Sequence, residues 1–104
     1  MTDRELHDCL DGLADVQAWA RCDALGEVIR RGGAGDARFA GAAPVLLHQA
    51  TEIGRAMGLG TLRDLELHGE VHVMCLPSDD GALLVEAGSR GALTPVTRLL
   101  AMAA

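Results

Sequence analysis

Residues 68–85 read HGEVHVMCLPSDDGALLV and crowd reactive side-chain types into a short stretch. Imidazole, thiol and carboxylate groups are the ligands that zinc prefers, and imidazoles and carboxylates are also common general acids and bases. A zinc site needs three or four such groups to converge on one point. The groups here belong to His68, His72, Cys75, Asp79 and Asp80. Whether they can converge depends on the strands and turns that carry them.

Short segments of alternating polarity surround this stretch and are separated by turn-forming residues, as is typical of strands. The three segments are 61–68, 71–77 and 82–87. If Gly69 and Glu70 form a two-residue hairpin loop, His68 pairs with Val71, and paired residues share a face of the sheet. One face then carries Leu65, Leu67, His72, Met74 and Leu76, and the other carries Asp64, Glu66, His68, Val71, Val73 and Cys75.

This alternation predicts that the stretch is the middle of a sheet rather than a reactive site. His72 and Cys75 are an odd number of positions apart, so they point to opposite sides of a strand and cannot hold one ion. The two aspartates precede Gly81 at a turn, where short polar side chains bond their own backbone. We therefore predict no metal site, no catalytic residue and no cofactor.

Two other arrangements could support chemistry, and we favour a structural interpretation of both. The second hairpin can bring Glu86 across from His72 as an ion pair, but a sheet-edge histidine satisfied by another neighbour is the simpler hypothesis. Gly32, Gly33 and Gly35 could hold an anion ahead of a helix. Without a lysine or a phosphate-binding spacing motif, they are more typical of a strand-to-helix connection.

Composition predicts one small domain, 1–104, around an aliphatic core, because 49% of the residues are hydrophobic and 2% are aromatic. Fifteen acidic and nine basic residues give a formal charge of −6, which repels a phosphate backbone and argues against nucleic acid as a partner. We find no secretory signal and no membrane-spanning run, so we expect a cytoplasmic protein without direct membrane insertion. The three cysteines form no C-x-x-C pair, and we expect them to be buried free thiols.

Caps and periodicity predict a helix at each end of the chain. Thr2 and Glu5 have capping-box spacing ahead of a short helix, and Thr94 and Pro95 begin the last one. The apolar stripe of the first helix is Leu6, Cys9, Leu10 and Leu13. A first hairpin, 16–22 with 27–31, follows that helix.

A long central helix is predicted from Asp36, which can cap it, to Met57, with Gly58 as its stop. Pro44 removes one N–H and predicts a kink or a restart. The expected buried stripe is Phe39, Ala43, Leu46, Ala50, Ile53 and Met57. Small or aliphatic residues beside this stripe would let another helix approach closely, and they are Ala43, Leu47, Ala50 and Gly54.

The order helix, two strands, long helix, three strands, helix resembles the Roadblock (dynein light chain) family over nearly the whole chain. Three segments carry the resemblance. VQAWARCDALGEVIRRGG is similar to the family's first hairpin, ATEIGRAMGLGTLRDLEL to its central helix and third strand, and GALLVEAGSRGALTPVTRLL to its last strand and helix. The chain departs from the family at Gly41 and Pro44, in the first turns of the central helix.

The resemblance implies an α+β fold, in which a five-stranded antiparallel sheet carries the long helix on one face and the two terminal helices on the other. It also implies a homodimer whose third strands pair edge to edge and whose long helices pack side by side. The third strand has no proline to guard its edge, so its backbone groups are open to pairing. The residues expected at the interface are Ala43, Leu47, Ala50, Gly54, Asp64, Glu66 and His68.

The resemblance further implies a partner, because bacterial and archaeal members look like regulators of Ras-like small GTPases, including the GTPase-activating subunit of gliding motility. There the paired central helices touch the GTPase. The matching positions outside the apolar arc are Arg38, His48, Thr51, Glu52 and Arg55. A merely solvated helix face is the alternative for them. Arg55 could supply an arginine finger in trans, but we favour repositioning of the GTPase's own residues.

Other classes of function remain as alternatives. A small-ligand sensor shares the same layering but needs a polar-lined pocket, and the aliphatic content argues for a filled interior. An enzyme that used His72 and Glu86 as acid and base would need a nucleophile motif that the sequence lacks. An orphan scaffold would have no GTPase partner. We expect a homodimeric interaction module that binds and regulates a Ras-like small GTPase and has no catalytic activity of its own.

Overall fold

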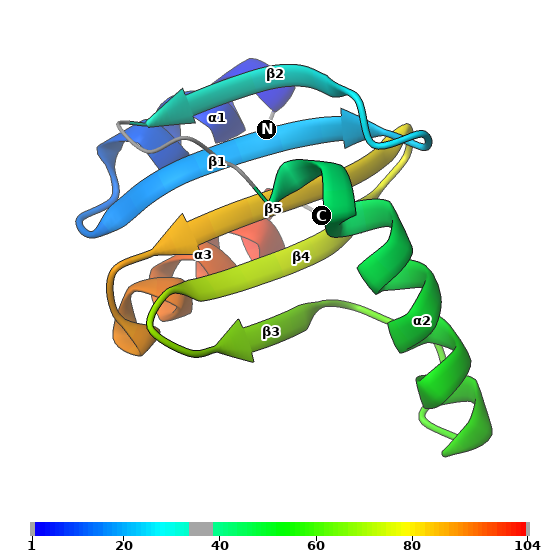
Figure 1. Cartoon of the computed structure of the whole chain (residues 1–104). Helices are drawn as coiled ribbons and strands as arrows, with labels where there is room; N and C mark the ends of the chain where they lie inside the picture. The colour runs from blue at the N-terminus through cyan, green and yellow to red at the C-terminus, as the bar shows by residue number, and fades with distance from the viewer. Residues whose placement is uncertain (1, 34–38, 104) are drawn as a thin grey trace.

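The computed structural model describes residues 2–33 and 39–103, whose helices and strands follow the predicted order (Figure 1). The elements are α1 (Asp3–Gly12), β1 (Val16–Asp23), β2 (Val28–Gly33), the 3₁₀ turn η1 (Ala40–Ala42), α2 (Ala43–Ala56), β3 (Leu65–His68), β4 (His72–Ser78), β5 (Gly81–Ala87), the 3₁₀ turn η2 (Arg90–Ala92) and α3 (Leu93–Ala103). Among these helices, none is long and apolar enough to cross a membrane.

The five strands form one antiparallel sheet in the order β2-β1-β5-β4-β3, so β2 and β3 are its edges. α2 lies on one face, and α1 and α3 lie together on the other (Figure 1). The predicted α+β fold is therefore confirmed, including the side of the sheet on which each helix packs. Because β5 is central and covered on both faces, every residue from Ala82 to Ala87 is buried.

Each face of the sheet has its own apolar core. The core under the terminal helices is centred on Leu6, Leu10, Trp19, Met74, Leu83, Val85, Leu93 and Val96. The core under α2 consists of Ala43, Leu47, Val73, Cys75, Ala82 and Leu84, and the β1 side of that face adds Ala18, Ala20, Cys22 and Ala40. The strands supply both cores because their successive side chains point to opposite faces.

α1 begins as predicted but presents a different flank to the sheet. The Thr2 hydroxyl oxygen accepts a hydrogen bond from the Glu5 N–H at 3.2 Å, which caps the first turn. The buried side chains of the helix are Leu6, His7 and Leu10. Cys9 is exposed, so the expectation that it belongs to the apolar stripe and is buried is wrong. His7 is buried instead because its ring stacks on the Trp19 indole, with 4.4 Å between the ring centroids.

α2 begins directly after a short 3₁₀ turn, as the predicted restart near Pro44 requires, and it ends where the sequence predicts. η1 precedes it, and Pro44 lies in its first turn, where a missing N–H breaks no helical hydrogen bond. The predicted cap, Asp36, lies outside the described residues. At the other end, Met57 caps the helix and Gly58 follows with φ of 71°, a left-handed conformation that glycine adopts without strain.

Only the first half of α2 packs on the sheet. Ala43 and Leu47 are 0% and 7% exposed and lie against β4 and β5, so they belong to the core of a single chain and not to the surface expected to meet a second copy. Ile53 and Met57 are 60% and 67% exposed. Figure 1 shows the reason, because the helix runs on beyond the sheet. The predicted buried stripe is thus wrong at its C-terminal end.

The β3–β4 register differs from the prediction by one residue. The hairpin loop is three residues long, and the Gly69 N–H donates to the Val71 carbonyl at 3.1 Å. The cross-strand pairs are Leu65 with Cys75, Glu66 with Met74, Leu67 with Val73, and His68 with His72. A one-residue slip moves every side chain of a strand to the other face. Glu66 and His68 therefore share a face with His72, which corrects the predicted separation of the two histidines.

Candidate functional site

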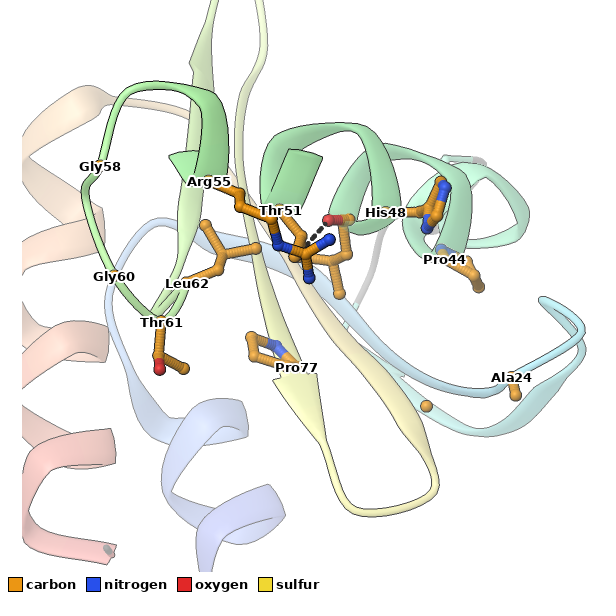
Figure 2. A pocket seen from close by; sticks show the side chains of 12 residues that line it. Ala24, Pro44, His48, Thr51, Arg55, Gly58, Gly60, Thr61, Leu62 and Pro77 are labelled. Atoms are coloured by element: carbon orange, nitrogen blue, oxygen red, sulfur yellow. Dashed lines mark hydrogen bonds between the residues drawn. The ribbon is translucent and has the colours of Figure 1, made fainter. Parts of the chain in front are cut away.

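An open groove with a volume of about 840 Å³ runs between α2, the loop that follows it and the turns at one end of the sheet. The wall from α2 carries His48, Thr51 and Arg55, and Leu62 and Pro77 lie across from it (Figure 2). Gly58, Gly60 and Thr61 from the α2–β3 loop complete one end. The structure thus brings together three of the five residues predicted to face a partner.

The spacing of the three α2 side chains explains why they share one wall. Positions i, i+3, i+4 and i+7 lie on the same side of a helix, and His48, Thr51 and Arg55 occupy three of them. The Arg55 guanidinium Nη1 lies 3.0 Å from the Glu52 carboxylate Oε1. Both side chains are more than half exposed, at 72% and 54%. Such a surface pair contributes about 0.2–1 kcal/mol, so an incoming group can redirect the guanidinium at little cost.

The inner part of the groove is apolar and offers one further polar group. The Thr51 hydroxyl donates to the Leu47 carbonyl at 2.7 Å, which leaves its oxygen able to accept a hydrogen bond from a partner. Leu47, Leu62 and Pro77 supply apolar surface beside it. The groove can bind a partner through these polar and apolar groups. Sequence reasoning missed the loop and Pro77, since only tertiary packing brings them to α2.

A second hollow lies on the flank of α2 that faces β3. Its volume is about 320 Å³, and its apolar lining includes Ala50, Ile53, Gly54, Leu59, Leu62 and Leu65. Of the predicted interface residues on α2, Ala50 and Gly54 line this hollow. The two flanks of α2 therefore differ. His48 and Arg55 line the groove alone, Ala50, Ile53 and Gly54 line the hollow alone, and Thr51 borders both.

The remaining predicted residues divide between the edge strand and positions that do not meet. Glu66 and His68 are exposed on β3, while Asp64 is half-buried just before the strand begins. Arg38 lies outside the described residues. The hypothesis of a His72–Glu86 pair is wrong, because Glu86 lies opposite Val73 and His72 opposite Ala87, so the two side chains point to different faces.

The buried thiols of Cys22 and Cys75 are poorly reactive at neutral pH. Burial, with a smaller contribution from Cys22, raises the pKa of Cys75 to about 11, and burial also raises the pKa of Cys22. Both thiols therefore stay protonated at neutral pH, and a protonated thiol is a poor nucleophile and metal ligand. Within residues 2–33 and 39–103, no three histidine, cysteine, aspartate or glutamate side chains gather in a metal-binding arrangement.

No family model and no curated protein matches the chain. Solved structures do match. MglB of Myxococcus xanthus superposes with a TM-score of 0.72 at 13% identity, over 91% of this chain and 85% of MglB. A Roadblock/LC7 domain from Streptomyces avermitilis superposes with a TM-score of 0.62 at 16% identity, over 94% and 91% of the two chains. The chain has the Roadblock/LC7 fold. A further structure, described as MglB with tetrameric arrangement, matches at 0.71 and 14% identity, over 92% of this chain and 80% of that one.

Proposed function

We propose that the chain is a homodimeric interaction module that binds and regulates a Ras-like small GTPase and has no catalytic group of its own. The observation that carries the proposal is the division of α2 into two exposed flanks, an apolar one beside β3 and a polar one on the groove. The fold shared with MglB, together with the resemblance of the sequence to Roadblock regulators of small GTPases, supports this class of partner.

A second copy of the chain fits the apolar flank. Ile53, Met57 and Leu59 are 60%, 67% and 69% exposed, so a single chain leaves these large apolar side chains in water. β3 lies next to this flank and is an edge strand, whose outer backbone groups can pair with another strand. A two-fold contact would use both features at once, since it joins the same patch on each copy. The existence of an MglB structure with tetrameric arrangement supports self-association in this fold.

The self-association is tested by Ile53→Asp with Val45→Asp as a matched control. Both residues lie on α2 with nearly equal exposure, 60% and 59%, but Ile53 lines the hollow beside β3 and Val45 does not. Burial of an isoleucine contributes about 1.5–3 kcal/mol, so we expect Ile53→Asp to weaken the dimer at least tenfold. Light scattering over a concentration series measures this. A monomer in the unaltered protein, or equal weakening by both variants, would refute the dimer proposed here.

The polar flank is proposed to contact the GTPase through His48, Thr51 and Arg55, with Glu52 and Arg38 beside them. Charge reversal by Arg55→Glu should weaken GTPase binding by about tenfold or more, because it removes the cation that would meet the partner and adds a second carboxylate beside that of Glu52. Arg98→Glu, an exposed change on α3 across the sheet, is the control. Calorimetry with the Ras-like GTPase of the same genome, in both nucleotide states, gives the affinities. No binding in either state would refute the partner.

A small-ligand sensor is a second candidate, because a groove of about 840 Å³ has the size of a small-molecule site. The groove lies open at the surface, so it does not bear on the expectation of a filled interior. Thermal stabilisation by a single metabolite, in the absence of any GTPase, would favour the sensor. We prefer the GTPase because the groove is open along one side, whereas small-molecule sites enclose most of their ligand.

A further inference from the structure

The β3–β4 hairpin brings two imidazoles into direct contact at an edge of the sheet. The Nδ1 atoms of His68 and His72 are 2.8 Å apart, and the rings are inclined by 51°. The contact follows from the observed register, in which the two histidines are cross-strand partners on one face. The groove and the apolar flank of α2 lie on the opposite face, so neither interaction proposed above uses this pair.

We propose that His68 and His72 form a two-imidazole chelate for a divalent transition-metal ion of the nickel or copper type. Bonds from imidazole nitrogen to such ions are about 2.0–2.1 Å long, so two ligands at a right angle have nitrogens about 2.9 Å apart. Right angles between neighbouring ligands are typical of square-planar and octahedral sites. The observed 2.8 Å is close to this spacing. Two ligands at the tetrahedral angle would be about 3.4 Å apart, which makes zinc the poorer fit.

Glu66 favours the tautomer that binding requires. Its Oε1 lies 3.7 Å from Nε2 of His68, the ring nitrogen that faces away from His72. At 3.7 Å this carboxylate is too far for a direct hydrogen bond, but its charge favours the proton on Nε2. In that tautomer Nδ1 of His68 accepts the hydrogen bond from Nδ1–H of His72, and both nitrogens can bind a metal ion once that proton leaves. Metal-bound histidines commonly present their second N–H to a carboxylate, which orients the ring and raises its basicity. The third residue of the cluster thus supports the histidines without being a ligand.

The hairpin also preorganises the site and keeps it accessible. Backbone pairing already holds both Cα atoms, so binding orders few additional torsions. The His68 side chain is 24% exposed and His72 is half-buried, and the exposed carboxylates of Glu66 and Glu70 attract cations. Water would fill the remaining coordination positions, since no cluster of three protein ligands exists among the described residues. A second chain pairing with β3 would engage backbone groups, so the chelate does not depend on the proposed dimer.

Nickel chloride titrated into the full chain at pH 7.5 tests the chelate by calorimetry. All proteins carry Cys9→Ser, because this exposed thiol could bind metal by itself. We expect one ion per chain and at least tenfold weaker binding in His68→Ala and in His72→Ala. His48→Ala, which removes a lone exposed imidazole on α2, should bind like the parent. Glu66→Gln keeps both ligands and removes only a nearby charge, so it should weaken binding by less than either alanine substitution does.

A second measurement uses the protein in which His68 and His72 are both present, so the test remains valid if an alanine variant does not fold. Paramagnetic nickel should broaden the ring resonances of His68 and His72 at concentrations that leave the His48 ring unchanged. Affinity that survives either alanine substitution in a folded variant would overturn the proposal. Equal loss in His48→Ala, a stoichiometry of half an ion per chain, or uniform broadening of all three rings would overturn it as well.

Discussion

Replacement of His7 by leucine is expected to stabilise the fold, although His7 is a buried residue that stacks on Trp19. His7 is 3% exposed, and neither ring nitrogen has a hydrogen-bond partner in the described part of the chain. A buried polar group without a partner costs about 1–3 kcal/mol, whereas loss of a ring stack costs about 0.5–1.5 kcal/mol. Leucine is similar in size and a better helix former than histidine. The net gain should be about 1 kcal/mol at pH 7.5.

The gain should grow in acid. Burial, followed by the nearby charges of Arg21 and Arg30, lowers the pKa of His7 from its ordinary value of 6.5. The unfolded chain therefore takes up this proton at a higher pH than the folded chain does. Stability that depends on His7 is complete above about pH 6.5 and is lost as the pH falls toward the folded-state pKa. The loss is at most about 1.4 kcal/mol for each pH unit, and leucine removes it.

Urea unfolding at pH 7.5 and pH 5.5 measures both effects. The matched control is Cys9→Leu, which places leucine at an exposed position of the same helix and tests the contribution of helix propensity alone. We expect the His7→Leu protein to exceed the unaltered chain by more at pH 5.5 than at pH 7.5. Equal pH dependence in the two proteins would refute the argument from burial. A destabilised variant at both pH values would show that the ring stack outweighs the unpaired nitrogens.

Three other changes test separate parts of the structure. Gly32→Ala should destabilise the fold by about 1–3 kcal/mol in urea unfolding, because the added Cβ would lie 2.5 Å from the indole Nε1 of Trp19. Gly12→Ala is the control, because its Cβ meets nothing within 4 Å and should not destabilise the fold. In the proposed complex with a small GTPase, Arg55→Ala should retain any stimulation of GTP hydrolysis wherever binding persists, and loss of that stimulation with binding intact would reveal an arginine finger. In the native protein a thiol reagent should modify Cys9 rapidly, while Cys75, with a pKa of about 11, stays unmodified until unfolding.

The order of helices and strands could be predicted because several independent patterns in the sequence agree, whereas the face of the sheet on which each helix packs was implied by the resemblance to the Roadblock family. The Thr2 cap and the glycine after α2 each mark a boundary that the structure keeps. β5 is apolar along almost its entire length, as expected for a strand covered on both faces. When local propensity and global fold point to the same answer, the sequence determines the order of elements without further information.

Register could not be obtained in the same way, because β3 is an edge strand. Its four residues are half-buried or exposed on both faces, so neither choice of register leaves a strongly apolar face in water. The turn therefore determines the β3–β4 register, because Val71 joins the loop and extends it from two residues to three. That single residue places His68 beside His72, and no periodicity within either strand could have indicated the contact.

The buried residues of the helices were also only partly predictable. An apolar pattern identifies the apolar face of a helix, but it does not show which residues pack against that face. On α1, His7 and Cys9 flank the same leucine ridge, and only the position of the Trp19 ring decides that His7 goes inward. On α2, the pattern continues through Ile53 and Met57 although both residues are mostly exposed. Figure 1 shows that the helix runs on beyond the sheet. A sequence keeps apolar residues beyond the edge of its own core at a cost in solubility. An apolar continuation of this kind is therefore best explained by a surface that a second molecule covers.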